Sequence, residues 1–244
     1  MTVAVVGGTG TLGRQVVAGL RSRGADVRVL SRKSPDYPVD LRSGGGLAEA
    51  LSGCDTVVDA SNGATSTLVD GSGRLLAAEQ SAGVGHHVAI SIVGCDRAPM
   101  SYYKIKVRQE QVVEAGPVPW TIVRATQFHN LIDTMFTSSA RVGVLPKVRA
   151  LVQSVDVSEA AAFIADTATG GPLRARVQIA GPQLNDAREL AQLWRLATHS
   201  RAVSVPIHVP GKLGRALREG ALTNEHPDAR GTIRFADWLE SRAS

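Results

Sequence analysis

Two tyrosines and two lysines stand close together near the middle of the chain, in the segment Tyr102-Tyr103-Lys104-Ile105-Lys106. Tyr102 and Lys106 are four residues apart, a spacing that places a phenol and an ammonium on one face of a helix. A lysine charge beside a tyrosine lowers the pKa of the phenol, which then exchanges a proton with a carbonyl or an alcohol near neutral pH. Tyr103 lies three residues before Lys106 and can also approach it, and both rings can instead simply cover apolar surface. The segment predicts proton transfer, with Tyr102 as the first candidate.

A glycine-rich segment near the N-terminus has the residues that a bound phosphate requires. It reads Gly7-Gly8-Thr9-Gly10-Thr11-Leu12-Gly13, and it stands between an expected strand over residues 2–6 and an expected helix over residues 11–23. Gly7 permits a tight turn, Gly10 lets the backbone approach a pyrophosphate, and Gly13 lets the helix pack closely on the strand. Free N–H groups at the helix start face the phosphate charge. The pattern predicts a dinucleotide-binding site, with a purely structural turn as the alternative.

The second expected strand, residues 26–30, ends in basic residues. An acid at this point normally binds the ribose 2′-hydroxyl of NAD, but this chain has Ser31-Arg32-Lys33. A guanidinium and an ammonium pair with the 2′-phosphate of NADP. We therefore expect NADP(H) as the cofactor, with an exposed basic turn as the alternative reading. We expect Asp40 and Leu41, at the end of the third expected strand, to lie beside the adenine.

The positions of these residues depend on an alternation of strands and helices. Further strands are expected over residues 39–41, 56–59, 87–92, 120–124, 176–180 and 203–208, and further helices over 47–51, 75–82, 102–114, 130–140, 158–167, 186–197, 211–221 and 233–242. This order predicts an α/β fold with a doubly wound, Rossmann-type parallel sheet and a small C-terminal substrate-side lobe. We expect one integrated domain, with an NADP-binding core over residues 1–145 and a C-terminal part over 146–244 that completes the sheet and forms the lobe.

The amino-acid composition is that of a globular protein. Hydrophobic residues make up 43% and charged residues 20% of the 244 residues, values typical of a globular chain. No stretch approaches the roughly 20 consecutive apolar residues of a membrane span, and a first strand at Thr2 leaves no room for a signal sequence. We expect a soluble cytoplasmic protein without a membrane partner. Cys54 and Cys95 lack the spacing of a metal site and are expected to be reduced thiols.

The chain carries a formal net charge of +5. Its lysines and arginines are scattered, and the densest patch is Lys212, Arg215 and Arg218 on one expected helix face. We interpret this patch as a solvated helix face and expect no nucleic-acid partner. Part of the basic excess suits an anionic cofactor.

Taken together, these motifs resemble the short-chain dehydrogenase/reductases, in particular the atypical, NmrA-like group that includes NADPH-dependent quinone reductases. The resemblance covers most of the chain. It rests on the glycine segment 7–13, Arg32, Asp40-Leu41, Lys106-x-x-x-Glu110, Trp120-Thr121-Ile122-Val123-Arg124-Ala125-Thr126-Gln127-Phe128-His129, Val155-Asp156-Val157 and Ala180-Gly181-Pro182.

The resemblance implies roles for further residues. Ser91 would polarise a substrate oxygen, Tyr102 would donate a proton, and Lys106 would hold the nicotinamide ribose and tune the tyrosine. The loop after residue 124 would line the nicotinamide through Thr126, Gln127 and Phe128, and Ala60, Ser61 and Asn62 would flank the cofactor ribose. Many NmrA-like proteins lack the tyrosine, and some bind NADP without turnover.

Histidines offer little additional chemistry. His129 either reaches the mouth of the active site, where it would bind substrate, or has a structural role at a helix start. His86 and His87 open a strand, and no third ligand at a familiar spacing indicates a metal. A G-x-S-x-G sequence is absent, which disfavours serine hydrolase chemistry.

The sequence as a whole predicts an NADPH-dependent oxidoreductase that reduces a small carbonyl, quinone or enone substrate by hydride transfer. Two alternatives remain open. One is an NADP(H)-binding regulator or redox sensor without turnover, and the other is an NADP-using epimerase or dehydratase. The sequence does not distinguish a monomer from a homodimer.

Overall fold

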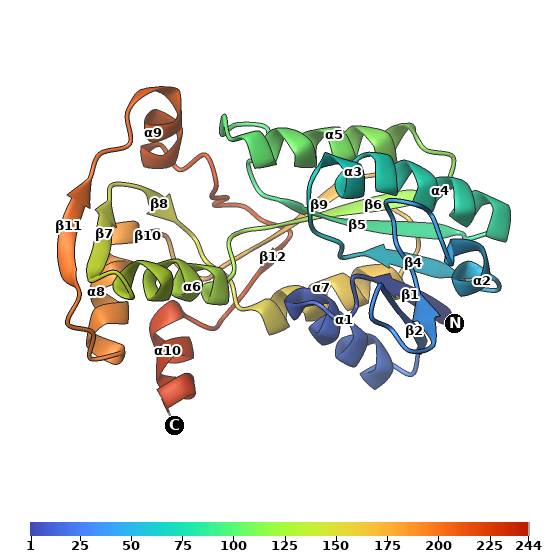
Figure 1. Ribbon diagram of the computed structural model, residues 1–244, viewed down its shortest axis with the longest axis horizontal. Coiled ribbons are helices and arrows are strands. Elements are labelled where there is room, and N and C mark those ends of the chain that lie inside the picture. The colour runs from blue at the N-terminus through green and yellow to red at the C-terminus, as the bar shows by residue number, and fades with distance from the viewer. Residues whose placement is uncertain (244) are drawn as a thin grey trace. The chain divides into compact units, whose positions relative to one another are not determined.

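Alternating strands and helices build a central sheet of eight strands in the computed structural model, which describes residues 1–243 (Figure 1). Its strands are β1 (Thr2–Val6), β2 (Asp26–Ser31), β3 (Tyr37–Pro38), β4 (Thr56–Asp59), β5 (His86–Ile92), β6 (Trp120–Ala125), β9 (Arg176–Ala180) and β12 (Ala229–Arg230). Their order is β12-β9-β6-β5-β4-β1-β2-β3, and the sheet is parallel. The expected doubly wound, Rossmann-type fold is confirmed.

The winding of the chain reverses at β1. This strand pairs in parallel with β2 on one side and with β4 on the other. In open α/β sheets, ligands bind outside the carboxyl ends of the strands at such a switch point. The glycine segment 7–13 directly follows β1, and residues 60–62 directly follow β4. The topology therefore brings two of the predicted cofactor segments to one place.

The chain forms two compact units that interleave along the sequence. Unit 1 comprises residues 1–91, 101–124 and 158–177, and unit 2 comprises residues 92–100, 125–157 and 178 onward. The boundary expected near Leu145 falls inside a strand of unit 2, and the division at this residue stays a prediction.

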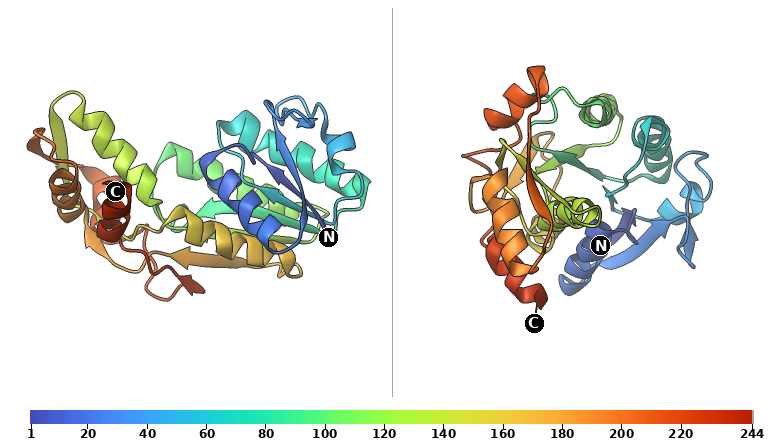
Figure 2. Two further views of the ribbon diagram at one scale, coloured as in Figure 1. Left: turned by 90° about the horizontal axis from the view of Figure 1, so that it is seen from below. Right: turned by 60° about the vertical axis from the view of Figure 1, so that its left-hand side comes forward.

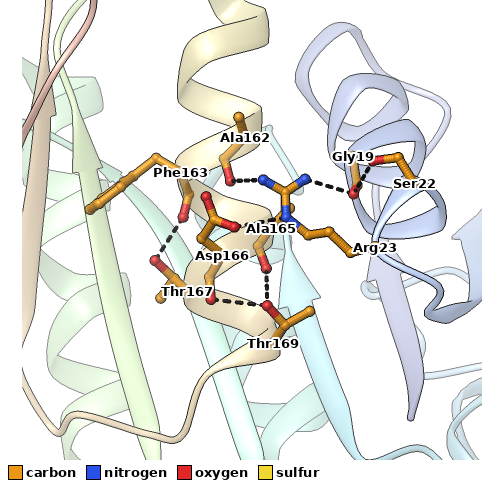
Figure 3. A network of polar contacts seen from close by, with 9 residues as sticks. All are labelled: Gly19, Ser22, Arg23, Ala162, Phe163, Ala165, Asp166, Thr167 and Thr169. Carbon is orange, nitrogen blue, oxygen red and sulfur yellow. Dashed lines mark hydrogen bonds and ion pairs between the residues drawn. The ribbon is translucent and has the colours of Figure 1, made fainter.

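In unit 1, two helices lie side by side on one face of the sheet (Figures 1 and 2). They are α1 (Thr11–Ser22) and α7 (Val157–Thr169). Beyond the end of α1, the Arg23 guanidinium donates to the Asp166 carboxylate over 2.7 Å and to the carbonyls of Gly19 and Ala162 (Figure 3). Val16 and Leu20 of α1 are fully buried. Buried apolar side chains and the hydrogen bonds of Arg23 therefore fix the position of the helix that follows the glycine segment.

The other face of the sheet in unit 1 carries four helices. They are α2 (Leu47–Leu51), α3 (Thr65–Leu68), α4 (Asp70–Ala82) and α5 (Ser101–Ala115). Leu51, Leu75 and Val113 of these helices are fully buried, together with Val57 of β4, in one hydrophobic core. α5 carries the tyrosine and lysine candidates, so their backbone is fixed by core packing.

Unit 2 contains two small sheets and four helices. β7 (Val144–Val148) pairs in parallel with β11 (Val203–Ile207), and β8 (Leu151–Val152) pairs antiparallel with β10 (Asn185–Asp186). The helices are α6 (His129–Ala140), α8 (Ala187–Ala197), α9 (Gly211–Arg218) and α10 (Phe235–Ala243). Phe136, Leu145, Trp194 and Phe235 form much of the core of this unit.

Several expected elements differ from those observed. The third strand was expected over residues 39–41 but is β3, because Asp40 forms an antiparallel bridge to Gly45 instead. β7 was not predicted, since Pro146 interrupts its pattern; proline is tolerated in a strand that has an open edge, as in this two-stranded sheet. β8, β10 and β12 have two residues each, too few to show alternation. α3 was missed, and α4 begins before residue 75 despite Gly71 and Gly73.

Two further properties concern the whole described chain. Within residues 1–243, no helix is both long and apolar enough to cross a membrane. Over the same residues, no three His, Cys, Asp or Glu side chains gather as metal ligands would. Cys54 and Cys95 are both buried, and neither is in a disulfide among these residues.

The buried histidine at the start of β5 makes the stability of unit 1 dependent on pH. Burial lowers the pKa of His86 from its ordinary value of 6.5 to about 4, and the side chain is only 3% exposed. The unfolded chain therefore binds a proton between these two pH values that the folded chain does not, so stability present above pH 6.5 is lost as the pH falls toward 4. We expect His86 to lower the free energy of unfolding by about 2 to 3 kcal/mol at pH 4.5 relative to pH 7.

Urea unfolding at the two pH values measures this loss. His86→Gln removes the titrating group and keeps a polar side chain near the Thr121 hydroxyl, which lies 3.0 Å from His86 Nε2. The variant should lose less stability on acidification than the unsubstituted chain. Equal losses in both would show that other groups account for the acid sensitivity.

Candidate functional site

The glycine segment has the shape of a phosphate cradle. Gly7 has a φ of +73°, and its N–H donates to the Leu30 carbonyl of β2 over 2.8 Å. A Cβ atom on Gly7 would lie 2.7 Å from the Ala60 carbonyl oxygen, so the segments after β1 and β4 lie against each other. A Cβ atom on Gly13 would lie 2.2 Å from the Gly7 carbonyl oxygen. The turn therefore closes only with glycine at these two positions.

The start of α1 offers free donors to an anion. Its N-cap is Gly10, which has no side chain to cap the helix, and the first turn contains no acid. The first N–H groups of a helix have no partner within the helix, and the helix dipole adds positive character there. The Ser61 hydroxyl, after β4, is buried without a hydrogen-bond partner among the described residues. These features fit a dinucleotide whose pyrophosphate faces α1.

The basic turn after β2 is exposed. Arg32 and Lys33 are both open to solvent, whereas Leu41 is buried in the core of unit 1. Hydrogen bonds and charge from Arg42, with a smaller effect of the Arg32 charge, lower the pKa of Asp40 to about 2. Asp40 is therefore ionised near Arg32, and Arg42 neutralises it through a 2.9 Å ion pair. Arg42 was not singled out from the sequence, because its role depends on this loop geometry.

Tyr102 is bound to the loop after β4. Its phenol donates to Asn62 Oδ1 over 2.9 Å, and its side chain is half-buried. Tyr103 is buried, with 9% exposed. The structure therefore favours Tyr102 over Tyr103 as the tyrosine that a ligand can reach. Through Asn62, Tyr102 joins the loop that contacts the glycine segment.

Lys106 is hydrogen-bonded in the protein interior, whereas the Tyr102 phenol is hydrogen-bonded to Asn62. Lys106 is 4% exposed, and its ammonium donates to the Ile90 carbonyl over 2.6 Å and to Gln109 Oε1. Burial raises the pKa of Tyr102 above its ordinary value of 10. The expectation that the lysine charge lowers this pKa is wrong, because the ammonium is turned into the protein interior.

A buried polar network explains the direction of Lys106. Gln109 Nε2 donates to Asp59 Oδ2 over 3.1 Å and to the Ser72 hydroxyl over 3.0 Å, so that its amide oxygen is presented to the lysine. Asp59 is 1% exposed, and its other carboxylate oxygen accepts from the Ser61 N–H. One buried negative charge thus balances one buried positive charge through Gln109. The same network fixes the loop that carries Ser61 and Asn62.

Ser91 lies in a second buried cluster. It is 4% exposed and hydrogen-bonds to the carboxylate of Glu110. Burial alone would raise the pKa of Glu110, but hydrogen bonds from Arg124 and Ser91, together with the charges of Arg124 and Arg176, lower that pKa. Arg124 donates two hydrogen bonds to this carboxylate. In this arrangement the serine has a structural partner, and its expected action on substrate stays a prediction.

The remaining predicted site residues lie in unit 2. Thr126 is buried, and its hydroxyl accepts from the Gly181 N–H. Gln127 Nε2 is buried without a partner among the described residues, and its expected contact with the nicotinamide stays a prediction. Phe128 forms a parallel bridge with Val155.

His129 is 1% exposed, with its ring nitrogens 2.9 Å from the Ser154 hydroxyl and 3.0 Å from the Ile233 carbonyl. Its ring also lies against those of Phe235 and Trp238. These contacts favour the structural alternative for this histidine.

Comparisons with known proteins agree with this description. A family model described as NAD(P)H-binding matches residues 7–169. The chloroplastic protein High Chlorophyll Fluorescence Phenotype 244 of Arabidopsis thaliana is 30% identical over 145 residues, which is 52% of this chain. The match spans only 37% of that protein.

Two solved structures share the fold at low sequence identity. The NADPH-dependent quinone oxidoreductase of Escherichia coli in complex with NADPH has a TM-score of 0.82 and 16% identity, covering 99% of this chain and 100% of that one. A nucleoside-diphosphate-sugar epimerase of Staphylococcus aureus has a TM-score of 0.77 and 17% identity, covering 98% and 100%. At these identities the similarity establishes the fold, which reductases and epimerases share.

Proposed function

Because the chain belongs to the NAD(P)H-binding family, we propose that it is an NADPH-dependent oxidoreductase that reduces a small quinone, enone or carbonyl compound. The observation that carries this proposal is the half-buried Tyr102 phenol, hydrogen-bonded to Asn62 on the loop that contacts the glycine segment. A quinone is the first substrate class to test, since the similar E. coli protein is a quinone oxidoreductase.

Each group has a definite part in the proposed reaction. NADPH, when bound, supplies the hydride. The glycine segment and the free N–H groups of α1 hold the pyrophosphate, and Arg32 pairs with the 2′-phosphate. Tyr102 donates the proton that the reduced oxygen needs. A phenol whose pKa is raised remains protonated at neutral pH and can therefore act as an acid. Asn62 orients the phenol.

A multiple-turnover assay tests the proposal. Oxidation of NADPH is followed by its absorbance, with a panel of benzoquinones, naphthoquinones and enones as acceptors. Several turnovers per protein molecule with at least one acceptor would support it. Tight NADPH binding without turnover on any member of the panel would contradict it.

That second outcome corresponds to an NADP(H)-binding sensor, and one observation favours this alternative. The Lys106 ammonium is committed to Ile90 and Gln109, so Tyr102 lacks the charge that activates a catalytic phenol in the predicted arrangement. A sensor would change its conformation with the oxidation state of the cofactor. Limited proteolysis with NADP⁺ and with NADPH would reveal such a difference, which a simple reductase does not require.

Cofactor preference is expected to depend on Arg32. Replacing Arg32 by Ala removes a charge-assisted contact worth about 1.5 to 3 kcal/mol, which corresponds to about ten- to a hundredfold in the Kd for NADPH. The Kd for NADH should change less than about twofold, because NADH has no 2′-phosphate. Fluorescence titration with both cofactors measures these values.

Arg108→Ala is the matched control for that experiment. It removes the same charge from an exposed position on α5 and should leave both dissociation constants unchanged. Equal Kd values of NADPH and NADH in the unsubstituted protein would contradict the proposed preference for NADP(H).

A further inference from the structure

A groove with a volume of about 600 Å³ lies in unit 2 beside the two-stranded sheet of β7 and β11. Its walls come from four places in the chain: the end of β7, the first turn of α8, the end of β11 and the last turn of α9. We call it the basic groove and define it by Lys147, Arg149, Arg188, Pro206, Ile207 and Arg218. Its volume is within the range of about 300 to 1,000 Å³ that is typical of sites for small molecules.

The acidic residues of the groove are already engaged. Asp186 accepts two hydrogen bonds from the Arg188 guanidinium, over 2.9 and 2.8 Å, and one from the Arg188 N–H. The Arg188 hydrogen bond is the largest cause that lowers the pKa of Asp186. Glu189 accepts from the Asp186 N–H and completes a capping box at the start of α8. Asp186 and Glu189 thus fix the first turn of the helix, and their charge offsets that of Arg188.

Three further cations line the groove, and the charge of one of them, Arg149, contributes to lowering the pKa of Asp186. Lys147, Arg149 and Arg218 form no ion pair with any residue in the described part of the chain. Within residues 1–243, the Arg218 guanidinium donates one long hydrogen bond of 3.4 Å, to the Val209 carbonyl. Like charges gathered at a concave surface raise the local concentration of anions. Guanidinium groups match the geometry of phosphate oxygens.

The groove also presents apolar surface. Pro206, Ile207 and Val209 line it next to the cations, and Ile207 is 42% exposed. An anion that carries an apolar group would bury this surface while its charge meets the guanidinium groups. The four cations and two carboxylates that line the groove leave it a formal charge of +2, which a dianion matches better than a monoanion does.

We propose that the basic groove binds a small phosphate monoester with an apolar substituent. The proposal does not depend on the proposed function, because every residue that carries it belongs to unit 2 and lies outside the predicted cofactor segments. It also accounts for Arg218, which the sequence assigns to a solvated face of α9.

Phenyl phosphate is the probe, because it combines a dianionic phosphate with an apolar ring. Binding to the full chain is followed by titration calorimetry and by amide shifts in NMR spectra. We expect phenyl phosphate to bind at least tenfold more tightly than inorganic phosphate, which lacks the ring, or phenol, which lacks the charge. The largest shifts should come from residues 147–149, 186–189 and 206–209.

Matched variants identify the site. Arg149→Ala combined with Arg218→Ala should weaken phenyl phosphate binding at least tenfold. Lys212→Ala combined with Arg215→Ala removes the same charge from α9 outside the groove and should change the Kd less than twofold. Arg32→Ala should also leave it unchanged, which excludes the predicted 2′-phosphate contact as the place of binding.

Three results would overturn the proposal. They are no measurable binding of phenyl phosphate, binding that the groove variants do not weaken, and binding of a single-stranded oligonucleotide through these residues without binding of phenyl phosphate. Failure of the NADPH turnover assay would leave the expected result at the groove unchanged, so the two proposals fail separately.

Discussion

Replacing Gly13 by Ala is expected to weaken NADPH binding at least a hundredfold. The added Cβ atom would lie 2.2 Å from the Gly7 carbonyl oxygen and 2.7 Å from the Gly8 Cα atom. Both are backbone atoms, so no side-chain rotation can relieve the overlap, and the turn between β1 and α1 must open. The N–H groups at the start of α1, which we propose to hold the pyrophosphate, then lose their common direction. A loss of two or more such contacts accounts for a hundredfold effect, about 2.7 kcal/mol.

Gly73→Ala is the control for this substitution. Gly73 lies on the exposed side of α4, and a Cβ atom there meets nothing within 4 Å. Alanine should stabilise that helix by about 0.5 to 1 kcal/mol and leave the Kd for NADPH unchanged. Circular dichroism and thermal unfolding establish that the Gly13 variant is folded before its affinity is measured. A folded Gly13→Ala protein with unchanged affinity would show that the pyrophosphate binds elsewhere.

The glycine segment was predictable because its requirements are local. A strand, a turn with glycines at three fixed positions and a helix are all visible in one stretch of sequence, and the structure has β1, the turn and α1 at those residues. The sheet was predictable for a related reason, since strands and helices that alternate leave few ways to bury both faces. These inferences use only near neighbours in the chain.

The direction of Lys106 was not predictable in this way. Spacing places Lys106 and Tyr102 on one side of α5, but Asp59 lies on β4 and Gln109 one turn further along α5. Only the fold brings the Asp59 carboxylate beneath the helix, where Gln109 connects it to the lysine. A buried carboxylate without a balancing cation is costly, so the lysine turns inward. His129 is a similar case, since Ser154 and Ile233 reach it from other parts of unit 2.

The two-residue strands β8, β10 and β12 and the proline-containing strand β7 were not predicted, whereas β11, which also contains a proline, was expected over residues 203–208. β7 contains Pro146 and β11 contains Pro206, and each proline lies opposite a residue of the other strand. A proline normally argues against a strand, because it removes one donor from the ladder. In a sheet of two strands, the proline nitrogen can face the open edge, where the ladder requires no donor. The basic groove could not be predicted either, because β7, which forms part of its wall, was not expected.

Replacing Tyr102 by Phe is expected to lower kcat about a hundredfold or more, on the acceptor that the panel identifies. The substitution removes only the hydroxyl, and with it the proton that the reduced substrate oxygen requires. The Kd for NADPH should stay the same, because the group acts in the transition state rather than in cofactor binding. Loss of the 2.9 Å hydrogen bond to Asn62 is expected to cost about 0.5 to 1.5 kcal/mol of stability, which thermal unfolding measures.

Tyr103→Phe and the pH dependence of kcat complete the test. Tyr103 is buried, so its variant should retain kcat within a few-fold of the unsubstituted protein. A general acid works only while protonated, and burial raises the Tyr102 pKa above 10, so kcat should not decline from this group until the pH exceeds 10. A decline near neutral pH that disappears in Tyr102→Phe would instead indicate a phenol activated by a nearby charge, which would require Lys106 to leave Gln109 when cofactor binds. Full activity of Tyr102→Phe would exclude this tyrosine as the proton donor, and the proton would then have to come from another side chain or from water.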